Sequence, residues 1–71
     1  MKELSFQNIF LNEVRRNNII VNIQLANGTN ISCYIQCYDN ETITVNTDNA
    51  QIMIYKSSIT SIVSKYQIIK Y

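Results

Sequence analysis

The side chains that could act as acids, bases or nucleophiles are few in this sequence. There is no histidine among the 71 residues. Acid–base catalysis needs two titratable groups held at a defined spacing around a reacting atom. The carboxylates are instead scattered over turns and helix faces, at Glu3, Glu13, Asp39, Glu41 and Asp48. The pattern predicts a protein that is not an enzyme.

The two cysteines, Cys33 and Cys37, are expected to be reduced residues of the core. On a single strand, residues four apart share a face and lie about 13 Å from each other, too far for a disulfide. Two sulfur ligands cannot complete a zinc site, and no imidazole is present to ionise a thiol. We therefore expect no metal and no other cofactor.

Length and composition are those of a small folded module. Of the 71 residues, 46% are hydrophobic and 15% are charged, with one glycine and no proline. A disordered segment would be less apolar, and a chain of this length has room for one core. No apolar run approaches the roughly 20 residues that span a bilayer, and no signal-peptide block follows residues 1–5. We expect a single domain over residues 1–71, soluble and cytoplasmic, with no membrane partner.

The charge balance limits how this chain could bind an anion. Its formal net charge is +1. Proteins that bind nucleic acid through overall charge carry a much larger positive excess. Any anion site must therefore be local.

Hydrophobic spacing predicts one helix at the start of the chain. Apolar groups recur at helical intervals over residues 5–16, and Ser5 is suited to the N-cap position. Arg15 and Arg16 lie in the last turn, where positive charge complements the helix dipole. The two asparagines that follow are expected to end the helix.

From residue 19 the apolar residues alternate, which predicts short strands joined by turns. Asn27-Gly28 predicts a hairpin, interpreted as a type I′ turn in which both central residues have positive φ. Residues 64–71 could form a sixth strand or a frayed end. The predicted strands cover residues 19–26, 29–38, 41–46, 51–55 and 59–63.

The residue patterns of two predicted strands indicate which side chains are buried. The strand over 29–38 should turn Tyr34 and Tyr38 outward, and should bury the alternate residues Ile31, Cys33, Ile35 and Cys37. Residues 51–55 are apolar on both faces, so both faces should be covered. Either the sheet closes as a barrel or one of its edges pairs with another subunit.

The order and spacing of these signals resemble the Hfq family of ring-forming, Sm-like RNA chaperones. Phe10-Leu11-Asn12 with Arg15-Arg16 is similar to the family's helix, and Leu25-Ala26-Asn27-Gly28 to its first hairpin. Ile54-Tyr55-Lys56 with Ile59 is similar to its signature between the last two strands. The resemblance covers residues 5–63.

The resemblance implies an Sm-like fold, mainly β with one N-terminal helix on a strongly bent five-stranded antiparallel sheet, a small open barrel. It also implies a homohexameric ring joined edge to edge through the fourth and fifth strands. The expected subunit interface consists of Ile52, Met53, Ile54, Tyr55, Ile59 and Ile62.

The resemblance further implies a pore face that holds U-rich single-stranded RNA. Gln7, Asn40 and Lys56 match the family's amides and cation, which read base edges and bind phosphate or the terminal hydroxyl. Glu41 stands in place of an aromatic shelf, and Ser57 replaces the histidine of a Lys-His pair. A carboxylate there removes stacking worth about 1–3 kcal/mol per base and repels phosphate. Uridine binding should therefore be weaker or differently specified.

Two further RNA-binding regions are implied. Arg15 and Arg16 resemble a basic rim patch that contacts RNA bodies. A-rich RNA would bind on the opposite face, although Gln24 and Ser32 depart from the family pattern. Cys33 stands where the family has a glycine that lets the strand bend, which leaves the curvature open. The opposite-face positions are Gln24, Asn27, Thr29, Ser32, Gln51 and Ser61.

Most of these residues also have a purely structural explanation. The rim arginines complement the helix end whether or not they bind RNA. Without the resemblance, Gln7 and Asn40 are most simply a solvated helix residue and a turn residue, and Lys56 is soluble charge.

We expect a non-enzymatic ring that binds small RNAs and mRNA and promotes their annealing or stability in post-transcriptional regulation. The alternative is an Sm-like ring that serves as a protein-interaction or assembly scaffold with weak RNA binding. Glu41 and Ser57 favour this alternative.

Overall fold

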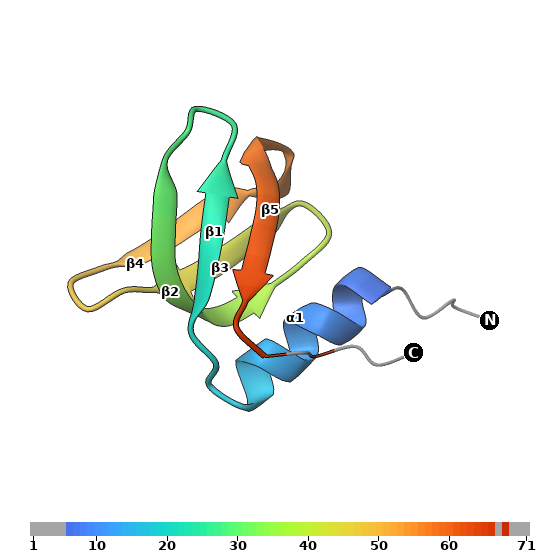
Figure 1. The fold of residues 1–71 in the computed structure, drawn as a ribbon. Helices are drawn as coiled ribbons and strands as arrows, with labels where there is room; N and C mark the ends of the chain where they lie inside the picture. Colours follow the sequence, from blue (N-terminus) through green and yellow to red (C-terminus); the bar gives the residue numbers. More distant parts are fainter. Residues whose placement is uncertain (1–5, 67, 69–71) are drawn as a thin grey trace.

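The computed structural model describes residues 6–66 and residue 68, in which one helix packs against a five-stranded sheet (Figure 1). The proposed N-cap Ser5 and most of the tail after residue 66 lie outside the described residues. No helix in the described part of the chain is long and apolar enough to cross a membrane. The elements are α1 (Phe6–Arg16), β1 (Val21–Leu25), β2 (Asn30–Tyr38), β3 (Thr42–Asn46), β4 (Gln51–Tyr55), the 3₁₀ turn η1 (Lys56–Ser58) and β5 (Ile59–Ser64).

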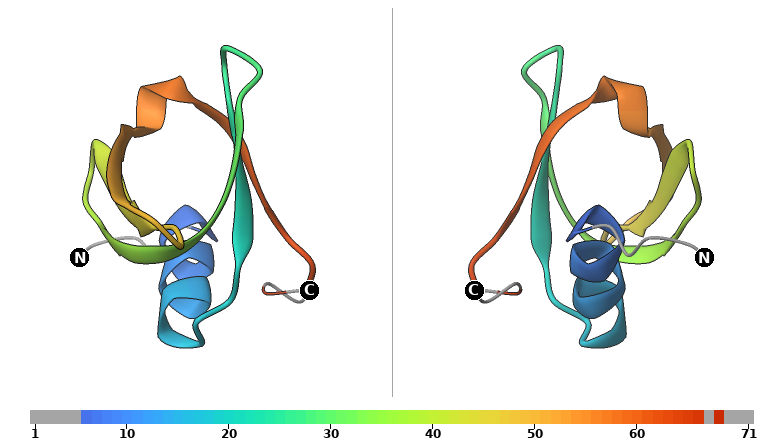
Figure 2. Two further views of the ribbon diagram at one scale, coloured as in Figure 1. Left: turned by 90° about the vertical axis from the view of Figure 1, so that its left-hand side faces the viewer. Right: turned by 90° about the vertical axis from the view of Figure 1, so that its right-hand side faces the viewer.

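The sheet has the order β4-β3-β2-β1-β5, and every neighbouring pair is antiparallel. Figure 2 shows the sheet curving round from β4 to β5 without closing. Within the described residues, β4 and β5 are thus edge strands with one side unpaired. The predicted fold, one N-terminal helix on a bent and open antiparallel sheet, is confirmed.

The helix ends at a left-handed asparagine. Asn18 has a φ of 52°, a conformation that asparagine tolerates better than most residues. Around it, the amide of Ile19 donates to the carbonyl of Val14 at 3.0 Å, and the amide of Asn18 donates to that of Arg15 at 3.3 Å. These two bonds form a Schellman motif. Because Ile19 belongs to this cap, β1 begins at Val21, two residues later than predicted.

The hairpin between β1 and β2 differs from the predicted type I′ turn. The amide of Gly28 donates to the carbonyl of Leu25 at 3.0 Å, and the amide of Leu25 donates to that of Thr29 at 2.8 Å. In this loop only Gly28 has a positive φ, of 89°. The connection is therefore a three-residue loop in which a left-handed glycine follows a type I turn. Asn27 keeps a negative φ, and its side-chain oxygen accepts a hydrogen bond from the amide of Thr29 at 3.0 Å.

Strand β2 contains a bulge that reverses its alternation. Residues 30–33 pair with β1, and the rest of the strand pairs with β3. The register with β3 shifts between Ile35 and Cys37, so Gln36 is an extra residue. Beyond it Cys37 is exposed and Tyr38 packs against the core. The prediction that Cys37 faces inward and Tyr38 outward was wrong, because a bulge cannot be seen in a period-two pattern.

The core lies between α1 and the inner face of the curved sheet. Cys33 is buried within it, and β2 passes from one half of the sheet to the other directly after this residue. The strand therefore bends without the glycine of the family pattern. Burial also raises the pKa of the Cys33 thiol, which keeps it protonated. The buried residues are Leu11, Val14, Val21, Ile23, Cys33, Ile35, Ile43, Val45 and Ile54.

A single carboxylate organises the turn between β2 and β3. One oxygen of Asp39 accepts hydrogen bonds from the amides of Glu41 at 2.9 Å and Thr42 at 2.8 Å, and from the Thr42 hydroxyl at 3.0 Å. These bonds, the backbone ones first, hold the pKa of Asp39 below its usual range, with a smaller contribution from the positive charge of Lys56. The ionised carboxylate thus fixes the loop that carries Asn40 and Glu41.

Because of this turn, the free energy of unfolding is expected to depend on pH in the acidic range. Because the pKa of Asp39 is lower in the folded chain than in the unfolded chain, its contribution is complete above the ordinary aspartate pKa of about 3.9. It is lost as the pH falls through the lower folded value. Urea unfolding between pH 3 and pH 7 should therefore show Asp39→Asn less stable than the wild type near neutrality, with the difference shrinking in acid.

Asp48→Asn is the matched control for this experiment, since it removes the same charge from another exposed turn. An equal and parallel pH profile in both variants would contradict the role given to the Asp39 turn.

Candidate functional site

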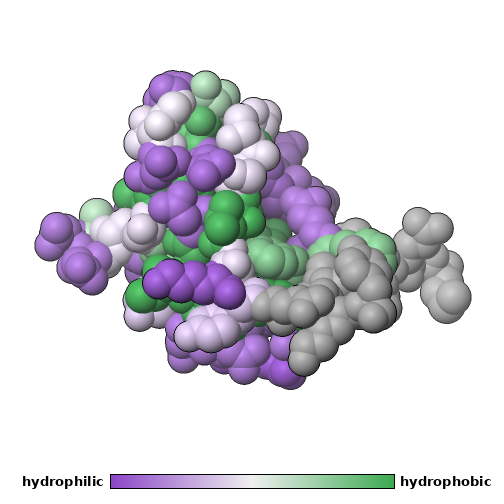
Figure 3. Space-filling model, in the orientation of Figure 1, coloured by the Kyte–Doolittle hydropathy of each residue, from purple (hydrophilic) through white to green (hydrophobic). Residues whose placement is uncertain are grey.

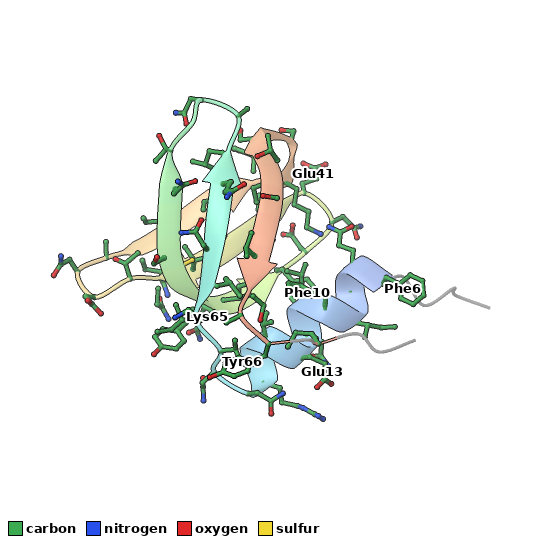
Figure 4. The ribbon with its side chains drawn as sticks, viewed as in Figure 1. Phe6, Phe10, Glu13, Glu41, Lys65 and Tyr66 are labelled. Atoms are coloured by element: carbon green, nitrogen blue, oxygen red, sulfur yellow. The ribbon has the colours of Figure 1, made fainter. Side chains whose placement is uncertain are left out.

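The loop after β2 and the turn η1 meet around a hollow of about 280 Å³. The amide of Lys56 donates to the carbonyl of Glu41 at 2.7 Å, which joins the two loops. Figure 4 shows Glu41 on the β2–β3 loop, where its side chain is exposed. The hollow is lined by Asn40, Glu41, Tyr55, Lys56 and Ser57. Four of the five residues predicted for the pore face therefore lie together, and Gln7 is the one outside.

Tyr38 links this hollow to the helix. The Lys56 ammonium lies 5.8 Å from the centre of the Tyr38 ring, within range of a cation–π interaction. The Tyr38 hydroxyl donates to the carbonyl of Asn8 at 3.2 Å, in the first turn of α1 that also carries the exposed Gln7. Tyr38 thus positions the cation against the start of the helix. Sequence patterns alone do not reveal this role, because the bulge in β2 turns the ring inward.

The hollow is suited to binding and not to bond making. It presents an amide, a carboxylate, an ammonium group, a hydroxyl and a phenol. Among the described residues the ion pair of Arg16 with Glu13 is the sole salt bridge, so the Lys56 ammonium is not held by a carboxylate. Such a set can donate to and accept from the edge of a nucleobase and attract one phosphate.

The two arginines predicted for the rim are exposed at the end of α1. Arg15 donates to the Asn12 side-chain oxygen at 2.7 Å. Arg16 forms an ion pair with Glu13 at 3.3 Å, and 65% of the Arg16 side chain remains exposed. Exposed pairs of this kind contribute about 0–1 kcal/mol. A phosphate could therefore replace the carboxylate at little cost.

The residues predicted for the opposite face fall into separate groups on the outer surface of the sheet. The Ser61 hydroxyl donates to the Gln24 side-chain oxygen at 2.6 Å, across β5 and β1. Asn27 and Thr29 are joined within the hairpin. Ser32 accepts from the Asn22 amide at 3.4 Å, and the Gln51 amide donates to the oxygen of Asn46 at 3.0 Å. Each polar group is supported by a neighbour, but the structure does not gather the six residues into one site.

The residues predicted for the subunit interface differ in exposure. Ile54 is 7% exposed and belongs to the core of its own chain, while Ile52, Ile59 and Ile62 are half-buried. Met53 and Tyr55 on edge strand β4 are 60% and 57% exposed. Large apolar groups on an unpaired edge promote association unless they are covered.

The sequence and the fold were compared with those of known proteins. The family model described as "Hfq protein" matches residues 6–69. The RNA-binding protein Hfq of Alkaliphilus metalliredigens is 39% identical over 59 residues, which are 83% of this chain and 74% of that protein. The RNA-binding protein Hfq of Clostridium botulinum strain Hall is 41% identical over 58 residues, which are 82% of this chain and 68% of that protein.

A similar fold occurs in a crystal structure of the pleiotropic translational regulator Hfq. The TM-score is 0.78 at 24% sequence identity, and the match covers 89% of this chain and 100% of the other. The structural likeness supports the Sm-like fold, and the sequence matches establish the family. They confirm that the protein is not an enzyme, as its scattered carboxylates predicted. The chain belongs to the Hfq family.

Proposed function

We propose that this chain forms a hexameric ring in the cytoplasm that binds single-stranded RNA and promotes the annealing or stability of small RNAs. The pore face would take U-rich segments and the opposite face A-rich segments. The observation that carries the proposal is the hollow in which Asn40, Glu41, Lys56 and Ser57 meet. The family, and the RNA-binding proteins named within it, support the same conclusion.

The two sheet edges that are unpaired among the described strands support a ring. A β4 edge that carries exposed Met53 and Tyr55 needs a cover, and the β5 edge of a second copy has the free backbone groups to provide one. Such a contact joins different surfaces of each copy, so it closes into a ring when the rotation is correct. Each added copy contributes another Lys56, and the ring concentrates positive charge that one chain with a net charge of +1 lacks.

The chemistry of the hollow supports recognition of a base next to a phosphate. Asn40 can pair with a base edge, and Lys56 can bind phosphate. Glu41 adds a negative charge within the same hollow. Uridine binding is therefore expected to be retained but weakened.

The proposed function first predicts the mass of the assembly. Size-exclusion chromatography with light scattering should give the mass of six chains at micromolar concentration, because the apolar β4 edge is otherwise exposed to water. A monomer that persists on dilution and at high concentration alike would contradict the ring and every site that depends on it.

Replacing Lys56 by alanine tests the pore face. Oligo-U binding, measured by fluorescence anisotropy at several salt concentrations, should weaken. The slope of log K against log salt should fall by about 0.7 for each phosphate that the side chain no longer neutralises. Lys56→Arg keeps the charge and should keep the slope.

An unchanged slope in Lys56→Ala would reject the pore assignment. If neither oligo-U nor oligo-A binds the wild type more tightly than a random oligomer, the scaffold function is favoured instead.

Glu41→Gln tests the weakening of uridine binding. Removing one exposed negative charge per chain should raise oligo-U affinity about two- to fivefold at low salt, the range of single exposed charge interactions. The gain should shrink at high salt, where charges are screened. A loss of affinity in anisotropy titrations would mean that the carboxylate contacts the RNA directly.

A further inference from the structure

The outer face of the sheet carries a row of side chains on β4, β3 and β2 that continues to the residues flanking β1 and β5. Tyr34 on β2 pairs with Asn46 on β3, and Asn46 pairs with Gln51 on β4. On the other side, Val21 pairs with both Cys33 and Ser64. Next to these pairs, Ile20, Tyr34 and Lys65 line one hollow. Paired residues of antiparallel strands share a face, so the row faces away from the core.

Exposure and shape distinguish one end of this row. Ile20 is 54% exposed, Tyr34 is 40% exposed and Tyr66 is 67% exposed. These three residues line one hollow of about 430 Å³ together with Lys65, Asn17 and Asn18. Figure 4 shows Lys65 and Tyr66 at the end of β5, and Figure 3 shows hydrophobic and hydrophilic residues intermixed over this face. We call Ile20, Tyr34, Lys65 and Tyr66 the outer platform.

The outer platform lies outside the core of the described chain. Its four residues are absent from the core and from the side chains packed against the core. No described residue hydrogen-bonds the Tyr34 hydroxyl, and no described carboxylate pairs with Lys65. Solvent-exposed aromatic rings without a structural partner are available for binding.

The side chains of the outer platform favour single-stranded RNA as the ligand. A flat aromatic ring stacks on any base, a neighbouring cation binds the adjoining phosphate, and amides read the base edge. The outer platform supplies Tyr34 as the ring and Lys65 as the cation, while the amide of Asn18 lines the same hollow as both of them. An exposed tyrosine with flanking amides on the face of a sheet is also how other single-strand binding modules hold bases.

The outer platform is also continuous with the proposed RNA surfaces. Asn46 bonds to Gln51, one of the residues predicted for the opposite face. At the other side, Asn17 and Asn18 in the hollow follow directly after Arg15 and Arg16 of the rim. Asp48 lines a second hollow together with Ile20, Tyr34 and Asn46, so one carboxylate lies on the β3–β4 side of Tyr34. Lys65 lines the other hollow beside Tyr34, and a phosphate is expected there, away from Asp48.

We propose that the outer platform is an additional nucleobase site, in which Tyr34 stacks on a base and Lys65 binds its phosphate, so that one RNA strand passes from the opposite face to the rim. The inference rests on the proposed RNA binding and adds a site that neither the pore hollow nor the rim arginines provide.

The test uses anisotropy with the assembled protein and a labelled adenosine strand of about 16 nucleotides, which is long enough to extend beyond one face. Tyr34→Leu keeps an apolar side chain but removes the stacking ring, and should lower affinity about fivefold or more. Tyr34→Phe keeps the ring and should bind within about twofold of the wild type. Lys65→Gln should reduce the salt slope by about 0.7.

Photo-crosslinking of the same strand, carrying a photoreactive base, should label the peptide that contains Tyr34. Oligo-U binding at Lys56 should be unchanged in Tyr34→Leu, and light scattering should show an unchanged mass. Equal affinity of Tyr34→Leu and wild type, or an unchanged slope in Lys65→Gln, would overturn the outer platform while leaving the pore site intact. Failure of the wild type to bind any of these strands would instead refute the proposed function.

Discussion

The bend in β2 is the constraint on which the rest of the structure depends. One strand pairs with β1 through its first half and with β3 through its second, and an extra residue at Gln36 lets it change direction. Because the sheet curves at this point, a single helix and one inner face enclose the whole core. The same curvature leaves β4 and β5 as two separate unpaired edges among the described strands.

The bulge also builds the candidate pore hollow. By turning Tyr38 inward, it places a ring between the first turn of α1 and the ammonium group of Lys56. Immediately after this ring, Asp39 fixes the loop with three hydrogen bonds to one oxygen. Two loops that are distant in sequence are thereby held against each other, and the groups that could bind a nucleotide come from both of them. The arrangement relies on neutral amides, one cation and one carboxylate, which suits weak local contacts repeated over several copies.

The outer face of the sheet is mainly polar. Its polar groups are tied to one another in cross-strand pairs, such as Gln24 with Ser61 and Gln51 with Asn46. Tyr34 interrupts this polar surface with an exposed ring whose hydroxyl has no described partner. This tyrosine and Lys65 line one hollow, which is the basis of the additional nucleobase site proposed above.

Local patterns in the sequence determined the helix, the five strands and the hairpin at Gly28, because period and turn chemistry are properties of short segments. The resemblance to a family added the arrangement of the strands. The facing of Cys37 and Tyr38, the three-residue form of the hairpin loop and the cation–π contact of Lys56 could not be predicted this way. Each depends on a single extra residue or on contacts between loops far apart in the chain, and only the folded sheet decides where those groups meet. Composition and spacing therefore determine which elements form, whereas the curvature of the sheet decides which side chains can act together.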